Sequence, residues 1–376
     1  MGLDLDFAAI DHHGCPLLHP KIAANLPYAA IFTDRNDSDV IRQQVPQTLS
    51  YRRGLNTMAT LLGCEPTAEA IATRRRELGW AALVALCFKS ANLSTILLDD
   101  SLLPEACLPV SWHQNQIKTH RILALEPLAE RLLPQVTQFE VFLEWFRSEL
   151  DPPPAGVVAF KSIAAERGGL KIQPTDFEQA ALSFDEVLQR AADNPSEAVR
   201  LDAVLAHFLL AQALDIANKH GLPVQVHTAL GAASQDLSLA SPLNLRPLLE
   251  IPACRQVPII LLTGKPFTRE TAYLAAAYPQ VYVDYGRMIH VSSTGAQRTL
   301  QTLLEFCPTD KIVYGSGARF LPDAFYLAAK QGRRALAQVL EAAMAAGDLT
   351  GREAEAIAIA ILRGNSQRLY NIGPVA

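Results

Sequence analysis

The most constraining feature of this sequence is a series of short apolar, β-branched runs that alternate with helical stretches. Each run ends in polar residues and leads into a segment rich in alanine and leucine. Strands that alternate with helices in this way form βαβ units and a parallel sheet. Several runs lack polar/apolar alternation, which fits strands covered on both faces. The eight runs are Ala8–His13, Thr95–Asp99, Ile122–Glu126, Gly156–Lys161, Pro223–His227, Val257–Thr263, Val281–Tyr285 and Lys311–Ser316.

Eight such units predict an α/β fold, a (β/α)8 barrel of the TIM type. The chain has 376 residues, 49% of them hydrophobic, and α/β barrels of this size form one domain. We therefore expect a single domain over residues 1–376. Residues 20–90, between the first two runs, have helical patterns with cap-like starts at 36–38 and 66–69. We predict that they form a helical cap over the barrel mouth, inserted after the first strand.

Composition excludes several classes of function. The formal net charge is −5, so we expect binding neither to nucleic acid nor to a membrane surface. The six cysteines are scattered without a CxxC pair, which indicates reduced thiols and a cytoplasmic location. Residues 1–11 contain three aspartates and no basic residue, so we expect no signal peptide. No apolar run approaches the ~18 residues of a membrane-spanning helix.

The polar residues at the strand ends are the candidates for a site, because TIM-type barrels place their active sites there. Side-chain alternation puts His13 and Cys15 on one side of the first strand and His12 on the other, so His12 is the weaker candidate. His227 ends the fifth strand, and Gln225 shares its side. Imidazole and thiolate both suit Zn²⁺, so we predict one zinc or other divalent metal at His13, Cys15 and His227. The alternative is that Cys15 is a small buried apolar residue, His227 a satisfied core histidine, and no metal binds.

A set of motifs then points to a known family. The segments IDHHGCPLL, FKSIAAERGGL, PVQVHTALGAASQDLSLASPLNLRPLL, YGSGARFLPDAFYLAA and NSQRLYNI occur in this order and span nearly the whole chain. Together they resemble the amidohydrolase superfamily, in the amidohydrolase-2 branch related to domains found with glutamine-synthetase-like proteins. The resemblance implies a TIM-type barrel and metal-dependent hydrolysis of a C–N or C–C bond in a small carboxylated metabolite.

The departures from the family pattern concern the metal ligands. The second histidine of the first strand is Cys15, and the histidine of the sixth strand is Thr263. The aspartate of the eighth strand, which in the family binds metal and moves protons, is Gly317, and an aspartate after the fifth strand is Ala232. The residues carried over from the motifs are the metal ligands His13 and His227, together with Lys161, Glu126 and Arg167 as catalytic residues.

Four basic residues, Lys161, Arg167, Lys265 and Arg319, fall at or just after strand ends. Lys265 and Arg319 lie beside the two positions that lack the family's ligands. One hypothesis is that these cations replace a divalent metal and leave a pocket for an anion, with Gln225, Lys265 and Arg319 binding substrate. The alternative is that Lys265 and Arg319 point to solvent on their loops.

Two functions from different classes remain open. The first is a hydrolase with a reduced metal site. Gly317 supplies no base, and general acid–base assistance is worth roughly 10²–10⁴-fold in rate. Such an enzyme would therefore be slow unless Glu126, Asp323 or a cap residue served as the base. The second is a catalytically inactive barrel that binds a small anionic metabolite or a protein partner. A third alternative is Cys15 as a nucleophile activated by a histidine. The alanine-rich C-terminal helices could pack against a second copy of the chain in a homo-oligomer, or they could cover the barrel of their own chain.

Overall fold

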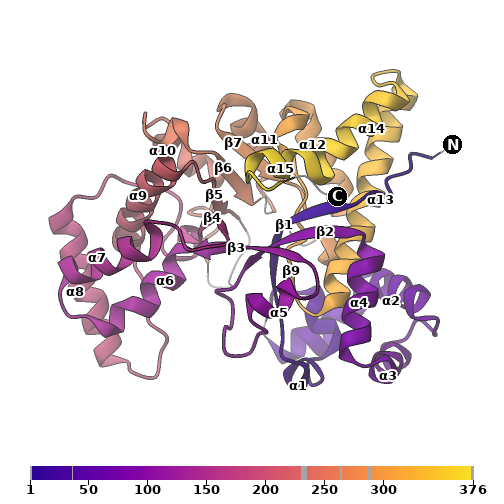
Figure 1. The fold of residues 1–376 in the computed structure, drawn as a ribbon, viewed down its shortest axis with the longest axis horizontal. Helices are drawn as coiled ribbons and strands as arrows, with labels where there is room; N and C mark the ends of the chain where they lie inside the picture. The colour runs from indigo at the N-terminus through magenta and orange to yellow at the C-terminus, as the bar shows by residue number, and fades with distance from the viewer. Residues whose placement is uncertain are drawn as a thin grey trace. The chain divides into compact units, whose positions relative to one another are not determined.

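The computed structural model describes residues 2–35, 37–229, 235–262, 265–286, 289–292 and 294–373. The chain divides into two compact units. Unit 1 comprises residues 1–120 and 284–376, and unit 2 comprises residues 121–283. Figure 1 shows the course of the chain through both. Within the part of the chain described, no helix has both the length and the apolar character needed to cross a bilayer.

Each of the eight predicted runs overlaps a strand, and a short ninth strand follows the last run. The prediction of an α/β fold built from these runs is confirmed. The described strands are β1 (Ala9–Leu17), β2 (Leu93–Asp99), β3 (Lys118–Ala124), β4 (Val157–Ser162), β5 (Val224–His227), β6 (Ile259–Leu262), β7 (Val281–Asp284), β8 (Ile312–Val313) and β9 (Ala318–Phe320).

Unit 2 is built from parallel strands joined by helices. The β4–β5 register pairs Lys161 with Gln225, and β5–β6 and β6–β7 continue in the same direction. The helix after β4 begins at Asp176, whose carboxylate accepts the Gln179 N–H in a capping box. The helices of unit 2 are α6 (Leu125–Leu132), α7 (Phe139–Leu150), α8 (Phe177–Asp193), α9 (Ala203–His220), α10 (Arg246–Leu249) and α11 (Thr268–Ala277), with short 3₁₀ turns at Leu133–Gln135, Ala164–Glu166, Pro242–Leu245 and Cys254–Gln256.

Two boundaries in unit 2 differ from the prediction. The third strand ends at Ala124 rather than at Glu126, and Glu126 lies in the first turn of α6. Pro127 is tolerated in that turn because its missing N–H has no intrahelical partner. The helical pattern of residues 196–220 predicts a helix from residue 196. Helix α9 starts only after Asp202, because the Asp202 carboxylate caps the helix by accepting the Leu205 N–H.

Unit 1 contains β2, β1 and β9 side by side, with β1 parallel to both neighbours. The predicted helical stretch at 37–62 is divided, because Pro46 follows a short π-type turn and α2 begins only after its N-cap Thr48. That residues 20–90 cover a barrel mouth stays a prediction. The helices of unit 1 are α1 (Pro20–Ala23), α2 (Leu49–Leu62), α3 (Ala68–Leu78), α4 (Trp80–Ala91), α5 (Val110–Gln114), α12 (Gly295–Phe306), α13 (Pro322–Ala346), α14 (Gly351–Ile359) and α15 (Asn365–Leu369), with single turns at Tyr28–Phe32, Val40–Gln44, Val45–Gln47, Ile289–Val291, Thr309–Lys311 and Ala360–Gly364.

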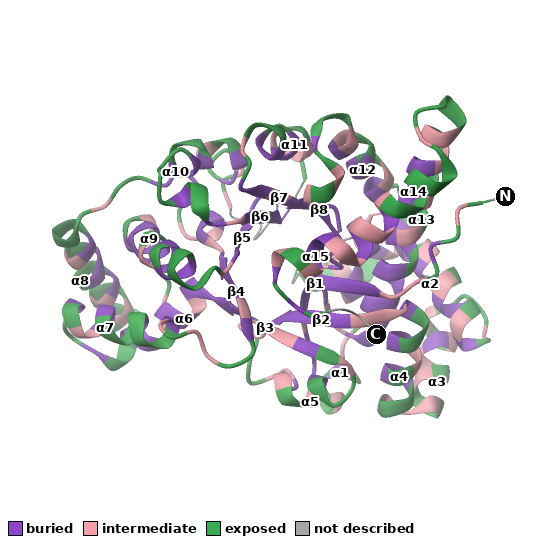
Figure 2. Cartoon of the chain, turned by 45° about the horizontal axis from the view of Figure 1, so that its top comes forward, coloured by how far each residue is buried: buried purple, intermediate pink, exposed green. Residues whose placement is uncertain are grey.

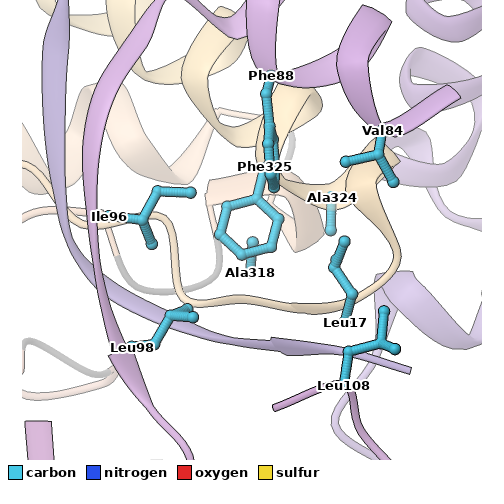
Figure 3. Close-up of a cluster of buried hydrophobic side chains, with 9 residues drawn as sticks. All are labelled: Leu17, Val84, Phe88, Ile96, Leu98, Leu108, Ala318, Ala324 and Phe325. Atoms are coloured by element: carbon cyan, nitrogen blue, oxygen red, sulfur yellow. The ribbon is translucent and has the colours of Figure 1, made fainter. Parts of the chain in front are cut away.

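A buried apolar cluster fixes β1 and β2 against α4 and α13 (Figure 3). The rings of Phe88 on α4 and Phe325 on α13 meet edge to face at 5.5 Å between centroids, a geometry that aromatic pairs favour. Ile96 and Leu98 of β2 and Leu17 of β1 pack beside Phe325. Figure 2 shows β1 buried along most of its length. Packing on this face therefore holds the strand that carries His13.

Candidate functional site

In unit 1, the segment that follows β8 is tied to β1 by backbone hydrogen bonds. The Ser316 N–H donates to Asp11 Oδ1 at 2.8 Å, and the Gly317 N–H donates to the His13 carbonyl at 2.8 Å. A Cβ at Gly315 would lie 2.7 Å from His13 Cβ and 2.9 Å from His12 Nε2. Glycine at 315 is thus required by the close approach of the two histidines. The backbone of His13 therefore lies next to the segment that follows β8, to which it is hydrogen-bonded.

The two histidines of β1 converge on one carboxylate, that of Asp284 at the end of β7. His13 Nδ1 lies 3.2 Å from Asp284 Oδ2, and His12 Nε2 lies 3.4 Å from the same oxygen. Side-chain alternation had placed His12 away from the site, but β1 has a register shift between Asp11 and Gly14. This irregularity brings both rings to Asp284. The other nitrogen of the His12 ring, Nδ1, meets Tyr370 Oη at 2.8 Å.

Asp284 is fully buried and stays ionised. Burial alone would raise its pKa, but the hydrogen bonds and charges of His12 and His13 outweigh burial and lower the pKa to about 2. An ionised carboxylate only accepts hydrogen bonds, so the His13 nitrogen that faces it carries the proton. In the neutral ring the lone pair is then on His13 Nε2. Asp284 thereby leaves Nε2 as the nitrogen of the neutral His13 ring that can accept a proton.

Asp11, also fully buried, has a positioning role. It accepts backbone N–H bonds from Ser316 and His13. Burial raises its pKa, although these hydrogen bonds and the nearby His12 oppose the increase. Because it accepts one backbone N–H from β1 and one from the segment after β8, Asp11 sets where these two parts of the chain meet.

In unit 2, three of the predicted site residues share one face of the sheet. Lys161 on β4 pairs in register with Gln225 on β5, and His227 follows two residues after Gln225 on the same side. All three are at least nine-tenths buried. His227 Nε2 lies 3.3 Å from Glu166 Oε1. A lysine, an amide and an imidazole–carboxylate pair thus form a second polar group.

Glu126 does not join that polar group. Its carboxylate accepts the Ser162 hydroxyl at 2.6 Å and the Ile163 N–H at 2.8 Å. Ser162 follows Lys161 on β4, so its side chain leaves the opposite face of the strand. Burial raises the pKa of Glu126 in spite of these two bonds. The geometry favours a role in anchoring the turn after β4, and the predicted catalytic role stays untested.

Arg167 forms a two-pronged ion pair with Glu130. Its Nη2 lies 3.0 Å from Glu130 Oε2, and its Nε donates to Oε1. The following Gly168 has a φ of +111°, and a Cβ there would lie 2.4 Å from Ala203 Cβ, so the turn requires glycine. Glu130 also accepts the Leu201 N–H. The Glu130 carboxylate of α6 therefore holds both Arg167, in the turn after β4, and the backbone just before α9.

We expect Arg167→Met to lower the free energy of unfolding by about 2–3 kcal/mol, because it leaves the Glu130 carboxylate without its cation. The two side chains are 10% and 13% exposed. Chemical denaturation would measure the change, and Glu130→Gln in the same chain should recover much of it. Arg131→Met, at a side chain 61% exposed, is the control. Unchanged stability of Arg167→Met would contradict this structural role.

The remaining predicted residues lie apart from these groups. Arg319 pairs with Asp34 at 2.8 Å and donates to the Thr33 carbonyl, so its charge is already matched within unit 1. Lys265 is exposed on the loop after β6, and Cys15 is half-buried on β1. The replaced positions Thr263 and Ala232 lie outside the described residues.

The predicted metal ligands come from both units: His13 and Cys15 from unit 1 and His227 from unit 2. Among the described residues of the chain, no three His, Cys, Asp or Glu side chains are arranged to hold a metal ion. Gly317 supplies no donor beside His13, whose Nδ1 faces Asp284. The described donors of unit 1 do not fit a metal centre, and the three-residue set stays a prediction.

Sequence reasoning missed the residues that surround His13. Asp284 was overlooked although it is an acidic residue in the run VYVDY and the last residue of β7, and a polar residue at a strand end is the signal that selected the other candidates. Tyr370 lies 358 residues from His12, and no local pattern indicated the contact. Glu166 adjoins Arg167 but was not singled out as the partner of His227.

Comparison with known proteins identifies the family. The sequence profile of the amidohydrolase family matches residues 176–372, more than half of the chain. The chain belongs to the amidohydrolase family. The motif-based prediction of the amidohydrolase-2 branch is confirmed.

This amidohydrolase is 30% identical over 402 aligned residues to protein fluG of Emericella nidulans, covering 96% of the chain and 45% of that protein. It therefore spans less than half the length of this relative. A metal-dependent hydrolase structure from Lactobacillus casei has a TM-score of 0.85 at 24% identity, covering 97% of this chain and 96% of that one. Glucuronate isomerase from Caulobacter crescentus has a TM-score of 0.69 at 14% identity, covering 100% and 95%. These likenesses establish the TIM-type barrel fold.

Proposed function

We propose that this amidohydrolase-family chain hydrolyses a C–N bond, or cleaves a C–C bond, in a small carboxylated metabolite, with His13 as the group that moves the proton. The observation that carries the proposal is the buried contact between His13 Nδ1 and the ionised Asp284. A histidine oriented by a buried carboxylate is an effective general base. The motif resemblance supplies the substrate class.

The chemistry follows from the tautomer that Asp284 selects. His13 Nε2 accepts a proton from a water molecule as the water oxygen attacks the carbonyl carbon. The imidazolium that forms lies beside Asp284, whose negative charge stabilises it. His13 then returns the proton from Nε2 to the leaving nitrogen as the C–N bond breaks. No step in this sequence passes through a metal.

Turnover by a His13→Asn variant tests the proposal. Asparagine can still donate a hydrogen bond to Asp284 but cannot take a proton, so we expect the rate to fall about 10²–10⁴-fold. The assay would offer N-acyl amino acids, N-carbamoyl amino acids and β-keto acids as substrates, and mass spectrometry would measure the products. The exposed His19→Asn is the control and should keep full activity.

Two results would contradict the proposal. One is a His13→Asn chain that turns over a substrate as fast as the wild type. The other is a folded wild-type chain that turns over none of these substrates, which would support the inactive barrel instead. Elemental analysis of the same preparations tests the predicted metal separately: one equivalent of Zn, Mn or Fe per chain that is lost in His13→Asn would support the ligand set His13, Cys15 and His227 in place of His13 as the base.

A further inference from the structure

A separate pocket in unit 1 lies where α2, α12 and α13 come together. Helix α13 contacts both α2 and α12, and all three helices are labelled in Figure 1. The pocket has a volume of about 140 Å³. It is lined by Arg53 of α2, by Thr294 and Gln297 at the start of α12, and by Arg334 of α13. No acidic side chain is among the described residues that line it.

The start of α12 supplies backbone donors to this pocket. The N-cap Thr294 makes no side-chain capping bond, and the first turn contains no acidic residue. The first N–H groups of a helix have no intrahelical partner, and the helix dipole gives this end a partial positive charge. In α12 that charge is not offset by a carboxylate of its own first turn. An anion at this end would satisfy these groups.

Gln331 gives an independent indication of a ligand. It lies on α13 and lines the pocket, and it is only 8% exposed. Neither its Nε2 nor its Oε1 has a hydrogen-bond partner among the described residues. A buried amide without partners costs about 1–3 kcal/mol. Gln331 shares its helix face with Arg334 and Gln338, which follow three and seven residues later.

Two arginines approach the pocket from different helices. Arg53 comes from α2 and Arg334 from α13. Burial lowers the pKa of Arg53, and the like charge of Arg334 lowers it further. Two guanidinium groups close enough to repel each other are stabilised by an anion between them. Arginine is the side chain best suited to hold oxyanions through several parallel bonds.

We propose that this pocket binds one phosphate group, held by Arg53 and Arg334, by Gln331 Nε2 and by the N–H groups at the start of α12. Donors that approach from three helices fit a tetrahedral anion, whose acceptor oxygens point in several directions, better than a planar carboxylate with two oxygens. The pocket has room for a small anion, so the ligand is inorganic phosphate or the terminal phosphate of a small metabolite. Bound phosphate would join α2, from the 20–90 insertion, to α12 and α13.

Isothermal titration of the full chain with inorganic phosphate, at constant ionic strength, tests the proposal. We expect saturable binding that weakens at least about tenfold in Arg334→Ala and in Arg53→Ala, because each loses a charge-assisted bond. Arg298→Ala, on α12 but not among the residues that line the pocket, should bind as the wild type does. Phosphate should also raise the Tm of the wild type.

Gln331→Leu separates a ligand role from a structural one. Replacing an unpartnered buried amide by an apolar side chain should leave the phosphate-free chain equally stable or more stable. The same variant should lose most of the phosphate affinity and of the phosphate-induced rise in Tm. A Gln331→Leu chain that binds phosphate with wild-type affinity would overturn the proposal.

Parallel titrations with glycerol 3-phosphate and acetate identify the ligand class. Tighter binding of glycerol 3-phosphate supports a phosphorylated metabolite, and tighter binding of inorganic phosphate supports the free ion. Acetate that binds as tightly as phosphate, or the absence of saturation by phosphate up to about 10 mM, would overturn the assignment. The site is independent of the proposed catalysis, so His13→Asn must bind phosphate as the wild type does.

Discussion

Asp284→Asn is expected to lower the free energy of unfolding by about 2 kcal/mol at pH 7. The estimate follows from a folded-state pKa of about 2 against an ordinary value of 3.8, since each pKa unit corresponds to about 1.4 kcal/mol. Chemical denaturation would measure it. Asp310→Asn, at an exposed position, should change stability by less than about 0.5 kcal/mol.

The pH dependence of this loss has a definite sign. The folded-state pKa of Asp284 is lowered, so the ionised carboxylate contributes its full stability above pH 4. That contribution is lost as the pH falls from about 4 to about 2, where the carboxyl becomes protonated in the folded state too. The difference between the wild type and Asp284→Asn should therefore shrink over this interval. A difference that stays constant down to pH 2 would show that Asp284 is not held ionised by the two histidines.

Arg75→Met is expected to destabilise the chain by about 3–5 kcal/mol, the largest effect on stability that the structure predicts. Arg75 Nε lies 3.3 Å from Asp323 Oδ1, and Asp323 is fully buried in the first turn of α13. Neither Asp323 oxygen has a hydrogen-bond partner among the described residues. Without Arg75, a buried charge would remain uncompensated, and thermal or chemical unfolding would measure the loss.

Two further variants serve as controls for the ion pair between Arg75 and Asp323. Arg76→Met, on the exposed side of α3, should be nearly neutral, and Asp323→Asn should offset much of the Arg75→Met effect. Burial already raises the pKa of Asp323 although Arg75 opposes the increase. The penalty in Arg75→Met should thus diminish toward acidic pH as Asp323 takes up a proton. A penalty that stays equally large from pH 7 down to the lowest pH at which the chain remains folded would contradict this role of the ion pair. Asp323 was one of the residues that could act as a base in place of the side chain missing at Gly317. Its ion pair with Arg75 argues against that role.

The fold could be predicted from the sequence because each strand and helix leaves a local pattern. The runs VPIILL and VYVDY are apolar over their own length, and β6 and β7 lie within them. The strand β9 was missed because three residues at Ala318–Phe320 are too few to form a pattern. Boundaries failed where a single side chain decides them, as Asp202 does for α9.

The site was less predictable because its contacts join distant parts of the chain. His13 was found from its place on a strand, but Asp284 lies 271 residues away. The register shift that turns His12 toward Asp284 leaves no trace in residue spacing. Arg167 was predicted to act in catalysis and Arg319 to bind substrate, and their partners Glu130 and Asp34 are set by packing that the sequence does not display.

The role proposed for His13 requires that Asp284 fixes the tautomer of the His13 ring. Nuclear magnetic resonance of the chain labelled with ¹⁵N in histidine measures the tautomer directly, at alkaline pH where the ring is deprotonated. We expect His13 to carry its proton on Nδ1 in the wild type, and Asp284→Asn to disturb this preference. A His13 ring protonated on Nε2 in the wild type, facing Asp284 with an unprotonated Nδ1, would contradict it.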